Sequence, residues 1–194
     1  NWGREGCGVS GIEIALWDLV GKIYGVPCYQ LLGGKYRDKV RLYADTPAPD
    51  EPTPEGYRRA LAGRKALGLT FIKFDIRPKL FEETPRGLVG QKTQGEYELG
   101  QRWRAPGTGQ GAKLTDQGIA AAVEIVAAIR EAVGDEISLC NDHFGHGYLT
   151  LDEMIRLGEA WEPYHLAWIE DPMPWWDIEG HKRVADALRT LWRW

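Results

Sequence analysis

The sequence predicts an α/β protein that forms part of a parallel (β/α) barrel of the TIM type, with about four βα units. Apolar runs typical of buried strands alternate with segments of helical periodicity along most of the 194 residues. Two of these runs end in a carboxylate, Asp142 after 137–141 and Glu170 after 165–169. Because parallel strands bring their C-terminal ends to one edge, where α/β barrels carry their chemistry, we expect the two carboxylates to lie together.

The first 36 residues are predicted to form a helix and a turn that lead into the barrel domain, 37–194. Apolar residues recur at helical spacing over 10–24, and Gly25 and Pro27 follow as stop signals. In the barrel domain we expect four strands, 40–44, 70–76, 137–141 and 165–169. We expect the helices of this domain over 55–67, 115–133, 151–161 and 178–188.

The stretch 77–113 interrupts this alternation. It contains many glycines and shows little periodicity, which is typical of a loop. A loop of this length in a compact domain is usually functional or disordered. We therefore expect one long loop insertion over the C-terminal edge of the sheet.

Composition and charge narrow the class of protein. Hydrophobic residues make up 43% of the chain, and 24 basic and 28 acidic residues are mixed throughout, so no basic stripe indicates a nucleic-acid partner. No apolar run approaches the roughly 18–20 residues that span a membrane. Cys7, Cys28 and Cys140 are odd in number and widely spaced, which argues against a disulfide framework or a zinc site. We expect a cytoplasmic protein that binds a small molecule, with neither nucleic acid nor membrane as a partner.

The two strand-end carboxylates predict a metal site. Asp142 and Glu170 are 28 residues apart, the length of one βα unit. Carboxylate oxygens are ligands for hard divalent cations, and Mg²⁺ is the commonest of these in such a position. The alternative is that each acid caps the next helix or faces solvent.

Several motifs resemble one family, and they occur in the family's order. The segment 10–22 reads SGIEIALWDLVGK and is followed by GVP at 25–27 and LLGG at 31–34. Lys73 lies in FIKFDI, Asp142 follows Asn141, and Glu170 lies in WIEDP. This pattern resembles the enolase superfamily, in its mandelate racemase/muconate lactonizing enzyme branch.

The resemblance implies a modified (β/α) barrel with a separate N-terminal capping domain. It implies one Mg²⁺ held by three carboxylates on consecutive strands, with Asp142 and Glu170 as the first two. A side-chain base removes the proton α to the substrate carboxylate, and the metal stabilises the resulting enediolate. The third ligand is expected to end a strand that begins after Thr190. We therefore expect a fragment, inactive by itself, of a parent enzyme that is a homo-oligomer.

The second strand departs from the family pattern. It reads Lys73-x-Asp75, where the family keeps a Lys-x-Lys pair. Alternate residues of a strand share a face, so both side chains are expected to point into the barrel. Either Lys73 is the base, or Asp75 pairs with Lys73 and tunes its pKa, or the two form a structural pair.

A second departure is histidine beside the first ligand position. The chain continues from Asp142 through His143, Phe144, Gly145 and His146. The resemblance to acid-sugar dehydratases implies that a histidine here helps the β-hydroxyl to leave as water, and either His143 or His146 can do so near neutral pH. A surface histidine or one that orients a ligand is the alternative.

Together these features predict a fragment of a Mg²⁺-dependent hydro-lyase. The parent enzyme is expected to remove the proton α to a carboxylate and to eliminate water from a sugar acid, an aldonate or aldarate. The first alternative is a cycloisomerase or epimerase of the same superfamily, whose chemistry relies on the altered Lys-x-Lys pair. The second is a non-catalytic truncated remnant.

Overall fold

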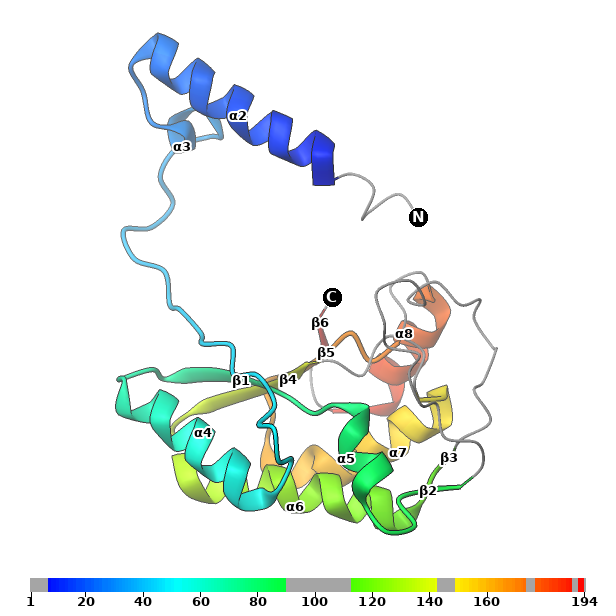
Figure 1. Ribbon diagram of the computed structural model, residues 1–194. Helices are drawn as coiled ribbons and strands as arrows, with labels where there is room; N and C mark the ends of the chain where they lie inside the picture. Colours follow the sequence, from blue (N-terminus) through cyan, green and yellow to red (C-terminus); the bar gives the residue numbers. More distant parts are fainter. Residues whose placement is uncertain (1–6, 90–112, 143–148, 174–176, 190–191, 194) are drawn as a thin grey trace. The chain divides into compact units, whose positions relative to one another are not determined.

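The computed structural model describes residues 7–89, 113–142, 149–173, 177–189 and 192–193. The chain divides into two compact units, Asn1–Arg41 and Leu42–Trp194, and each is described here by itself (Figure 1). In the described ranges, no helix combines the length and the apolar character that crossing a membrane requires.

In its described residues, 7–41, the first unit contains two helices. Helix α2 spans Cys7–Tyr24 and starts three residues before the predicted 10–24, so Ser10 lies inside the helix. Gly25 ends α2 with a φ of 64°, a left-handed conformation that glycine adopts without a steric cost. Helix α3, Cys28–Leu31, follows directly after Pro27.

The second unit is built on a parallel sheet with the strand order β1-β4-β5-β6. These strands are Phe71–Asp75, Ser138–Asp142, Trp168–Glu170 and Trp192–Arg193. The first three match predicted strands. The fourth, β6, pairs in parallel with β5 and begins where the strand after Thr190 was expected. The α/β class and the partial barrel arrangement are thus confirmed.

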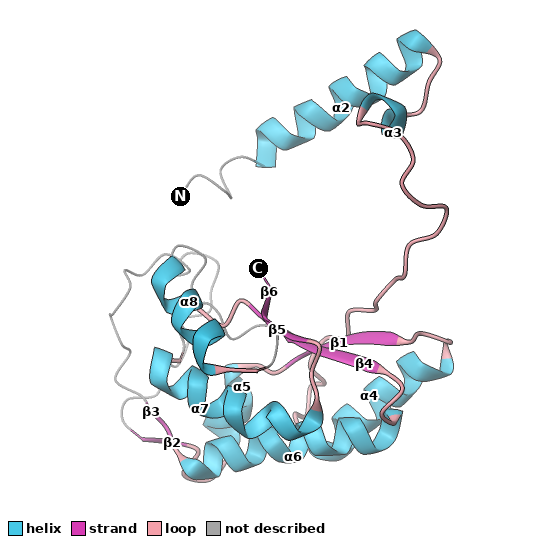
Figure 2. Cartoon of the chain, turned by 180° about the vertical axis from the view of Figure 1, so that it is seen from behind, coloured by secondary structure: helices cyan, strands magenta, loops and turns pink. Residues whose placement is uncertain are grey.

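Helices cover one face of this sheet, and the main core lies between the two layers (Figures 1 and 2). Helix α4, Pro54–Ala66, packs on α6, Asp116–Val133, and α7, Leu151–Trp161, follows β4. Ile72, Phe74, Leu139 and Ile169 alternate along the strands and are buried in this core. The strand residues that alternate with these core positions therefore face the other side of the sheet.

Helix α8, Ile178–Ala187, follows β5. Its N-cap is Asp177, whose carboxylate accepts a hydrogen bond from the Gly180 backbone N–H at 2.9 Å.

The predicted strand 40–44 is wrong over 40–43. Only Ala44 forms a bridge, in parallel with Ile72 of β1. In this register, residues 40–42 correspond to 68–70, which precede β1, and Gly68 turns the chain after α4 with a φ of 80°. Residues 40–42 therefore have no strand beside them to supply hydrogen bonds.

The predicted loop 77–113 is partly regular. Helix α5, Pro78–Glu83, begins with proline at its first position, which favours helix entry, and it buries Leu80 and Phe81. Strands β2, Leu88–Val89, and β3, Lys113–Leu114, form an antiparallel pair that closes the base of the insertion. Residues 90–112 lie outside the described part of the chain.

Candidate active site

The face of the sheet opposite the helix layer carries the predicted site residues at the C-terminal ends of three adjacent strands. Lys73 and Asp75 come from β1, Asp142 ends β4 and Glu170 ends β5. In the parallel register, Lys73 lies opposite Cys140 and Asp75 lies opposite Asp142. Because side chains alternate between the two faces of each strand, this register brings the side chains of Lys73, Asp75, Asp142 and Glu170 to one face of the sheet.

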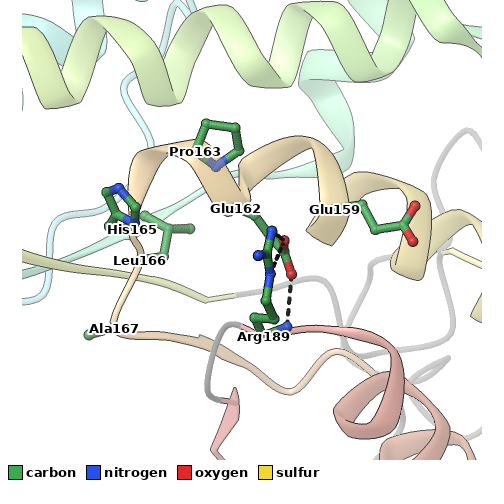
Figure 3. Close-up of a pocket in the computed structure, with 7 residues that line it drawn as sticks. All are labelled: Glu159, Glu162, Pro163, His165, Leu166, Ala167 and Arg189. Carbon is green, nitrogen blue, oxygen red and sulfur yellow. Dashed lines mark hydrogen bonds and ion pairs between the residues drawn. The ribbon is translucent and has the colours of Figure 1, made fainter.

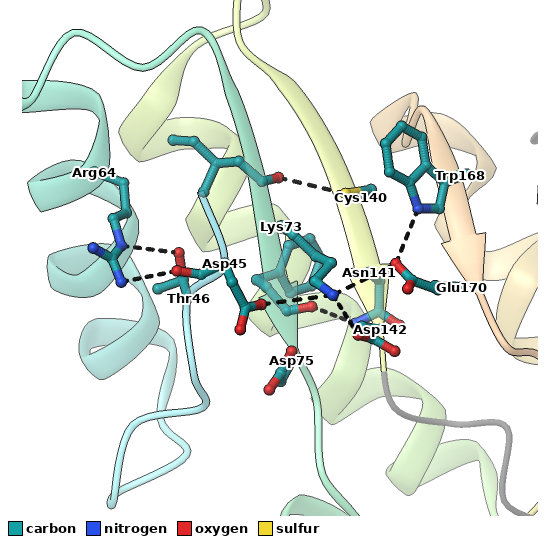
Figure 4. Close-up of polar contacts among 12 residues, drawn as sticks. Asp45, Thr46, Arg64, Lys73, Asp75, Cys140, Asn141, Asp142, Trp168 and Glu170 are labelled. Atoms are coloured by element: carbon teal, nitrogen blue, oxygen red, sulfur yellow. Dashed lines mark hydrogen bonds and ion pairs between the residues drawn. The ribbon is translucent and has the colours of Figure 1, made fainter. Parts of the chain in front are cut away.

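Lys73 joins the two predicted metal ligands (Figure 4). Its Nζ donates a hydrogen bond to Asp142 Oδ2 at 2.6 Å and lies 3.6 Å from Glu170 Oε2. The side chains of Lys73 and Asp142 are only 12% and 10% exposed, and that of Glu170 is 26% exposed. Both carboxylates therefore converge on a single cation in a partly buried position. We name Lys73, Asp142 and Glu170 the charged cluster.

A third carboxylate faces this cluster from the segment beside β1. Asp45 Oδ1 lies 3.8 Å from Lys73 Nζ. Its backbone is anchored by Arg64, which donates to the carbonyl of Asp45 at 2.8 Å and to the hydroxyl of Thr46 at 3.3 Å. In the sequence, the signal that could have identified Asp45 was its position directly after the predicted strand 40–44, two residues after Tyr43.

Burial and the acids act on Lys73 in opposite directions. Burial alone lowers the pKa of the Lys73 ammonium, but the hydrogen bond that Lys73 donates to Asp142 and the charges of Asp142, Glu170 and Asp45 outweigh it, so the pKa rises above its ordinary value. Lys73 is consequently a cation in this arrangement. Its proton becomes easier to remove when another cation neutralises the acids.

Asp75 lies in a different environment from Lys73. Its side chain is 4% exposed, and its Oδ2 lies 3.9 Å from Arg77 Nη2. The backbone carbonyl of Asp75 accepts a hydrogen bond from the Tyr57 hydroxyl at 2.7 Å. This burial favours a positioning role for Asp75 over direct contact with a substrate.

An aromatic group underlies the charged cluster. The rings of Tyr43, Phe71 and Trp168 pack against one another, and Trp168 Nε1 donates to Glu170 Oε2 at 3.4 Å. None of these three residues was predicted to belong to the site. Their spacing in the sequence was the signal that could have identified them. Tyr43 precedes Asp45, Phe71 precedes Lys73 and Trp168 precedes Glu170, each by two residues.

The donor set fits a hard divalent cation in part. Asp142 and Glu170 offer carboxylate oxygens that already converge on the Lys73 ammonium. Within the described ranges, no group of three histidine, cysteine, aspartate or glutamate side chains is arranged to hold a metal. The two predicted ligands, Asp142 and Glu170, are thus the candidates that the described residues offer. His143 and His146, the predicted general acids, lie outside the described residues.

A cavity of about 610 Å³ lies at the other end of β5 (Figure 3). His165, Leu166 and Ala167, which precede the strand, line it together with Glu162 and Arg189. Arg189 spans the cavity wall with a hydrogen bond of 2.7 Å from Nη2 to Glu162 Oε2. This cavity is separate from the charged cluster, because it lies where β5 begins and Glu170 lies where β5 ends.

Sequence relatives share this part of the chain. Residues 57–191 match the family described as Enolase C-terminal domain-like. The D-xylonate dehydratase of Haloferax volcanii is 36% identical over 183 residues, which are 94% of this chain and 38% of the relative. The D-galactonate dehydratase family member ManD of Chromohalobacter salexigens is 35% identical and covers 94% of this chain and 43% of the relative. The chain thus spans about two fifths of the length of these relatives.

Solved structures agree with the sequence relatives. A member of the enolase superfamily from Salmonella Typhimurium superposes with a TM-score of 0.69 at 30% identity, over 94% of this chain and 43% of that one. A mandelate racemase/muconate lactonizing enzyme-like protein from Roseovarius sp. TM1035 also gives 0.69, at 32% identity, over 94% of this chain and 41% of that one. With its fold, its strand-end acids and its matched residues, the chain belongs to the enolase superfamily, in the mandelate racemase/muconate lactonizing enzyme branch, and has relatives among acid-sugar dehydratases.

Proposed function

We propose that this chain is the part of a Mg²⁺-dependent sugar-acid dehydratase that carries the base and two metal ligands. The observation that carries the proposal is the convergence of Asp142 and Glu170 on the Lys73 ammonium, at 2.6 and 3.6 Å. The dehydratases among its relatives favour loss of water from a sugar acid. The activity and the substrate are proposed for the complete enzyme, because the chain spans about two fifths of those relatives.

Asp142 and Glu170 are the residues that would hold the cation. A bound Mg²⁺ supplies Lewis-acid stabilisation of the negative charge that develops on the substrate carboxylate. The third ligand is proposed to come from a strand after β5, as the family resemblance implies. The two acids present here stand at the C-terminal ends of the adjacent strands β4 and β5.

Lys73 is the proposed base. While the acids carry their full charge, they hold the proton on Nζ. A divalent cation that shared this charge would lower the pKa of Lys73, so that the free amine could form. The neutral Nζ then takes the proton α to the substrate carboxylate. Asp75, buried beside Arg77, keeps its place on the same strand and is proposed to position β1.

The departing hydroxyl needs a proton. His143 or His146 remains the proposed donor, because either follows Asp142 by a few residues. The α-proton stays on Lys73 Nζ, and the β-hydroxyl leaves as water with the proton from the histidine as the C3–O bond breaks. The enol that remains becomes a 2-keto-3-deoxy acid by taking a solvent proton at C3.

The test is a reaction in D₂O with a panel of aldonates and aldarates, using the product of the gene that carries this sequence. A dehydratase is expected to release a 2-keto-3-deoxy acid with one deuterium at C3, read by NMR. Lys73→Met is expected to lower this turnover at least about 100-fold, whereas Lys182→Met, which removes an exposed lysine of α8, leaves it unchanged.

Each rival function gives a different result in the same experiment. An epimerase exchanges the α-proton for deuterium without loss of water. A cycloisomerase gives an isomer of the same mass as its unlabelled substrate apart from exchanged hydrogen. A non-catalytic protein leaves every acid of the panel unlabelled. Any of these three patterns would contradict the proposal.

A further inference from the structure

The charged cluster stands on a layer of three aromatic rings. We name Tyr43, Phe71 and Trp168 the aromatic layer. The centroids of Phe71 and Trp168 are 4.7 Å apart with the rings at 75°, and Tyr43 meets Trp168 at 5.9 Å and 88°. Edge-to-face packing of this kind fixes the orientation of each ring. The indole of Trp168 is therefore held in place from two sides.

Trp168 directs its N–H to a proposed metal ligand. Residues 168 and 170 share a face of β5, and Trp168 Nε1 donates to Glu170 Oε2 at 3.4 Å (Figure 4). The same oxygen lies 3.6 Å from Lys73 Nζ. One oxygen of Glu170 thus has a cationic neighbour and a neutral donor.

The two neighbours differ in what a bound cation does to them. A divalent cation held between Asp142 and Glu170 repels the Lys73 ammonium, which lies against the same carboxylates. The indole N–H carries no net charge and is packed among rings, so it is not driven away. The contact between Trp168 and Glu170 would therefore persist with a cation bound, whereas the contact between Lys73 and Glu170 would weaken.

We propose that Trp168 is a positioning residue that holds Glu170 in the orientation a divalent cation needs. This inference rests on the proposed function of Glu170 as a metal ligand. The indole N–H limits the rotation of the carboxylate, and the aromatic layer supports the indole beneath it. Groups that orient metal ligands in this way commonly change metal affinity when they are removed.

The test measures Mg²⁺ affinity of the full chain by calorimetry. Trp168→Phe keeps an aromatic ring in the layer and deletes only the N–H donor. We expect the Kd for Mg²⁺ to rise about 3- to 10-fold, with the number of sites unchanged. Phe71→Leu loosens the indole but keeps its N–H, and a smaller rise of about 2- to 3-fold is expected.

Trp161→Phe is the matched control. Trp161 is buried in α7, and its Nε1 donates to the Ala122 carbonyl at 3.4 Å, the same length as the bond of Trp168. Its replacement deletes an equivalent hydrogen bond away from the charged cluster. We expect the thermal midpoint to fall and the Kd for Mg²⁺ to stay unchanged.

Terbium luminescence gives a second readout that packing alone does not affect. Tb³⁺ is a hard cation that binds carboxylates, and its emission is sensitised by an indole within a few ångströms. Because Trp168 touches Glu170, Trp168→Phe is expected to remove more than about half of the sensitised emission at saturating Tb³⁺. Trp161→Phe is expected to retain it.

The outcomes separate the inference from the proposal beneath it. If the unmodified chain binds Mg²⁺ and both Trp168→Phe and Phe71→Leu leave its Kd unchanged, the positioning role is overturned and the metal site stands. An equal loss of affinity in Trp161→Phe would also overturn it, since general stability would then explain the effect. If the unmodified chain binds no Mg²⁺, the metal site fails and the inference fails with it.

Discussion

Lys73 balances the charge of the acids around it. Three carboxylates, from Asp45, Asp142 and Glu170, lie within 4 Å of its Nζ, and the cluster is largely shielded from water. Close like charges in a partly buried place repel strongly. The ammonium therefore stabilises the metal-free fold as well as providing the proposed base.

Removing this ammonium is expected to destabilise the chain. Lys73→Met leaves Asp142 and Glu170 facing each other without a counter-ion, and we expect the free energy of unfolding to fall by about 1–3 kcal/mol. Lys182→Met is the control, because Lys182 pairs with Asp186 at 2.8 Å where both side chains are more than 60% exposed. Its effect is expected to be below about 0.5 kcal/mol. Urea unfolding measures both, and equal effects would contradict the charge-balance argument.

Alkaline pH is expected to destabilise the chain through three groups. Burial, together with the charge of Glu170, raises the pKa of the Cys140 thiol above its ordinary 9.0; burial, with Asp75, raises the pKa of Tyr57 above 10.0. The acids raise the pKa of Lys73 above 10.5. The unfolded chain thus releases these protons at lower pH than the folded chain, so stability is complete below about pH 9 and declines as pH rises further.

Urea midpoints at pH 7, 9 and 10.5 test this decline. Cys140→Ala removes the group with the lowest ordinary pKa, so its decline is expected to begin nearer pH 10. A midpoint that stays constant up to pH 10.5 in the unmodified chain would show that the folded and unfolded states release these protons together.

The sequence predicted which residues meet but not how they pair. Lys73, Asp142 and Glu170 were predicted on one face because strand periodicity and parallel pairing determine the face of each residue. The partner of Lys73 depends on side-chain rotamers, and the structure joins it to Asp142 at 2.6 Å. The contact of Trp168 with Glu170 depends on rotamers in the same way.

Side chains marked the start of one helix correctly and of another wrongly: α2 begins at Cys7, three residues before the predicted start at Ser10. Helix α7 occupies the predicted 151–161, and its start is fixed by Thr150 and Glu153, each of which accepts a hydrogen bond from the backbone N–H of the other. The strand 40–44 failed because pairing depends on a neighbour far along the chain. The apolar pattern of 40–44 shows that these residues can be buried. It does not show at which residue this segment begins to pair with β1.

Replacing two helix glycines with alanine is expected to change the free energy of unfolding in opposite directions. In α6, a Cβ on Gly118 would lie 2.5 Å from the Gly87 carbonyl oxygen, so Gly118→Ala is expected to lower the free energy of unfolding by about 1–3 kcal/mol. In α4, a Cβ on Gly63 meets nothing within 4 Å, and Gly63→Ala is expected to raise it by about 0.5–1 kcal/mol. Urea unfolding of the two variants checks the signs. If both substitutions changed the free energy of unfolding in the same direction, the packing around one of the two glycines would differ from that in the structure.

At the scale of the whole molecule, the chain spans about two fifths of its dehydratase relatives. Asp142 and Glu170 supply two of the three proposed ligands, and the proposed general acids lie outside the described residues. We therefore expect the isolated 194-residue chain to show no Mg²⁺-dependent loss of any sugar acid in the panel. Measurable turnover, abolished by Lys73→Met, would show that the residues present suffice.

The resemblance in motifs predicted the family because it rests on residues spread over most of the chain. Glu170 in WIEDP and Asp142 after a buried strand have the order and spacing that a shared barrel requires. The homo-oligomer expected of the parent enzyme stays a prediction, and so does the boundary proposed at residue 36. Both depend on which surfaces of the protein contact one another, and strand periodicity does not predict such contacts.

Calorimetric titration of the purified chain with Mg²⁺ tests the central claim most directly, with Asp142→Ala and Glu170→Ala as variants and thermal melts as the check on folding. The account predicts weak binding, with a Kd of about a millimolar for a cation with two protein carboxylates, and predicts that each variant abolishes it. The account would be contradicted by binding that survives in both variants, or by a cooperatively folded chain that binds no Mg²⁺.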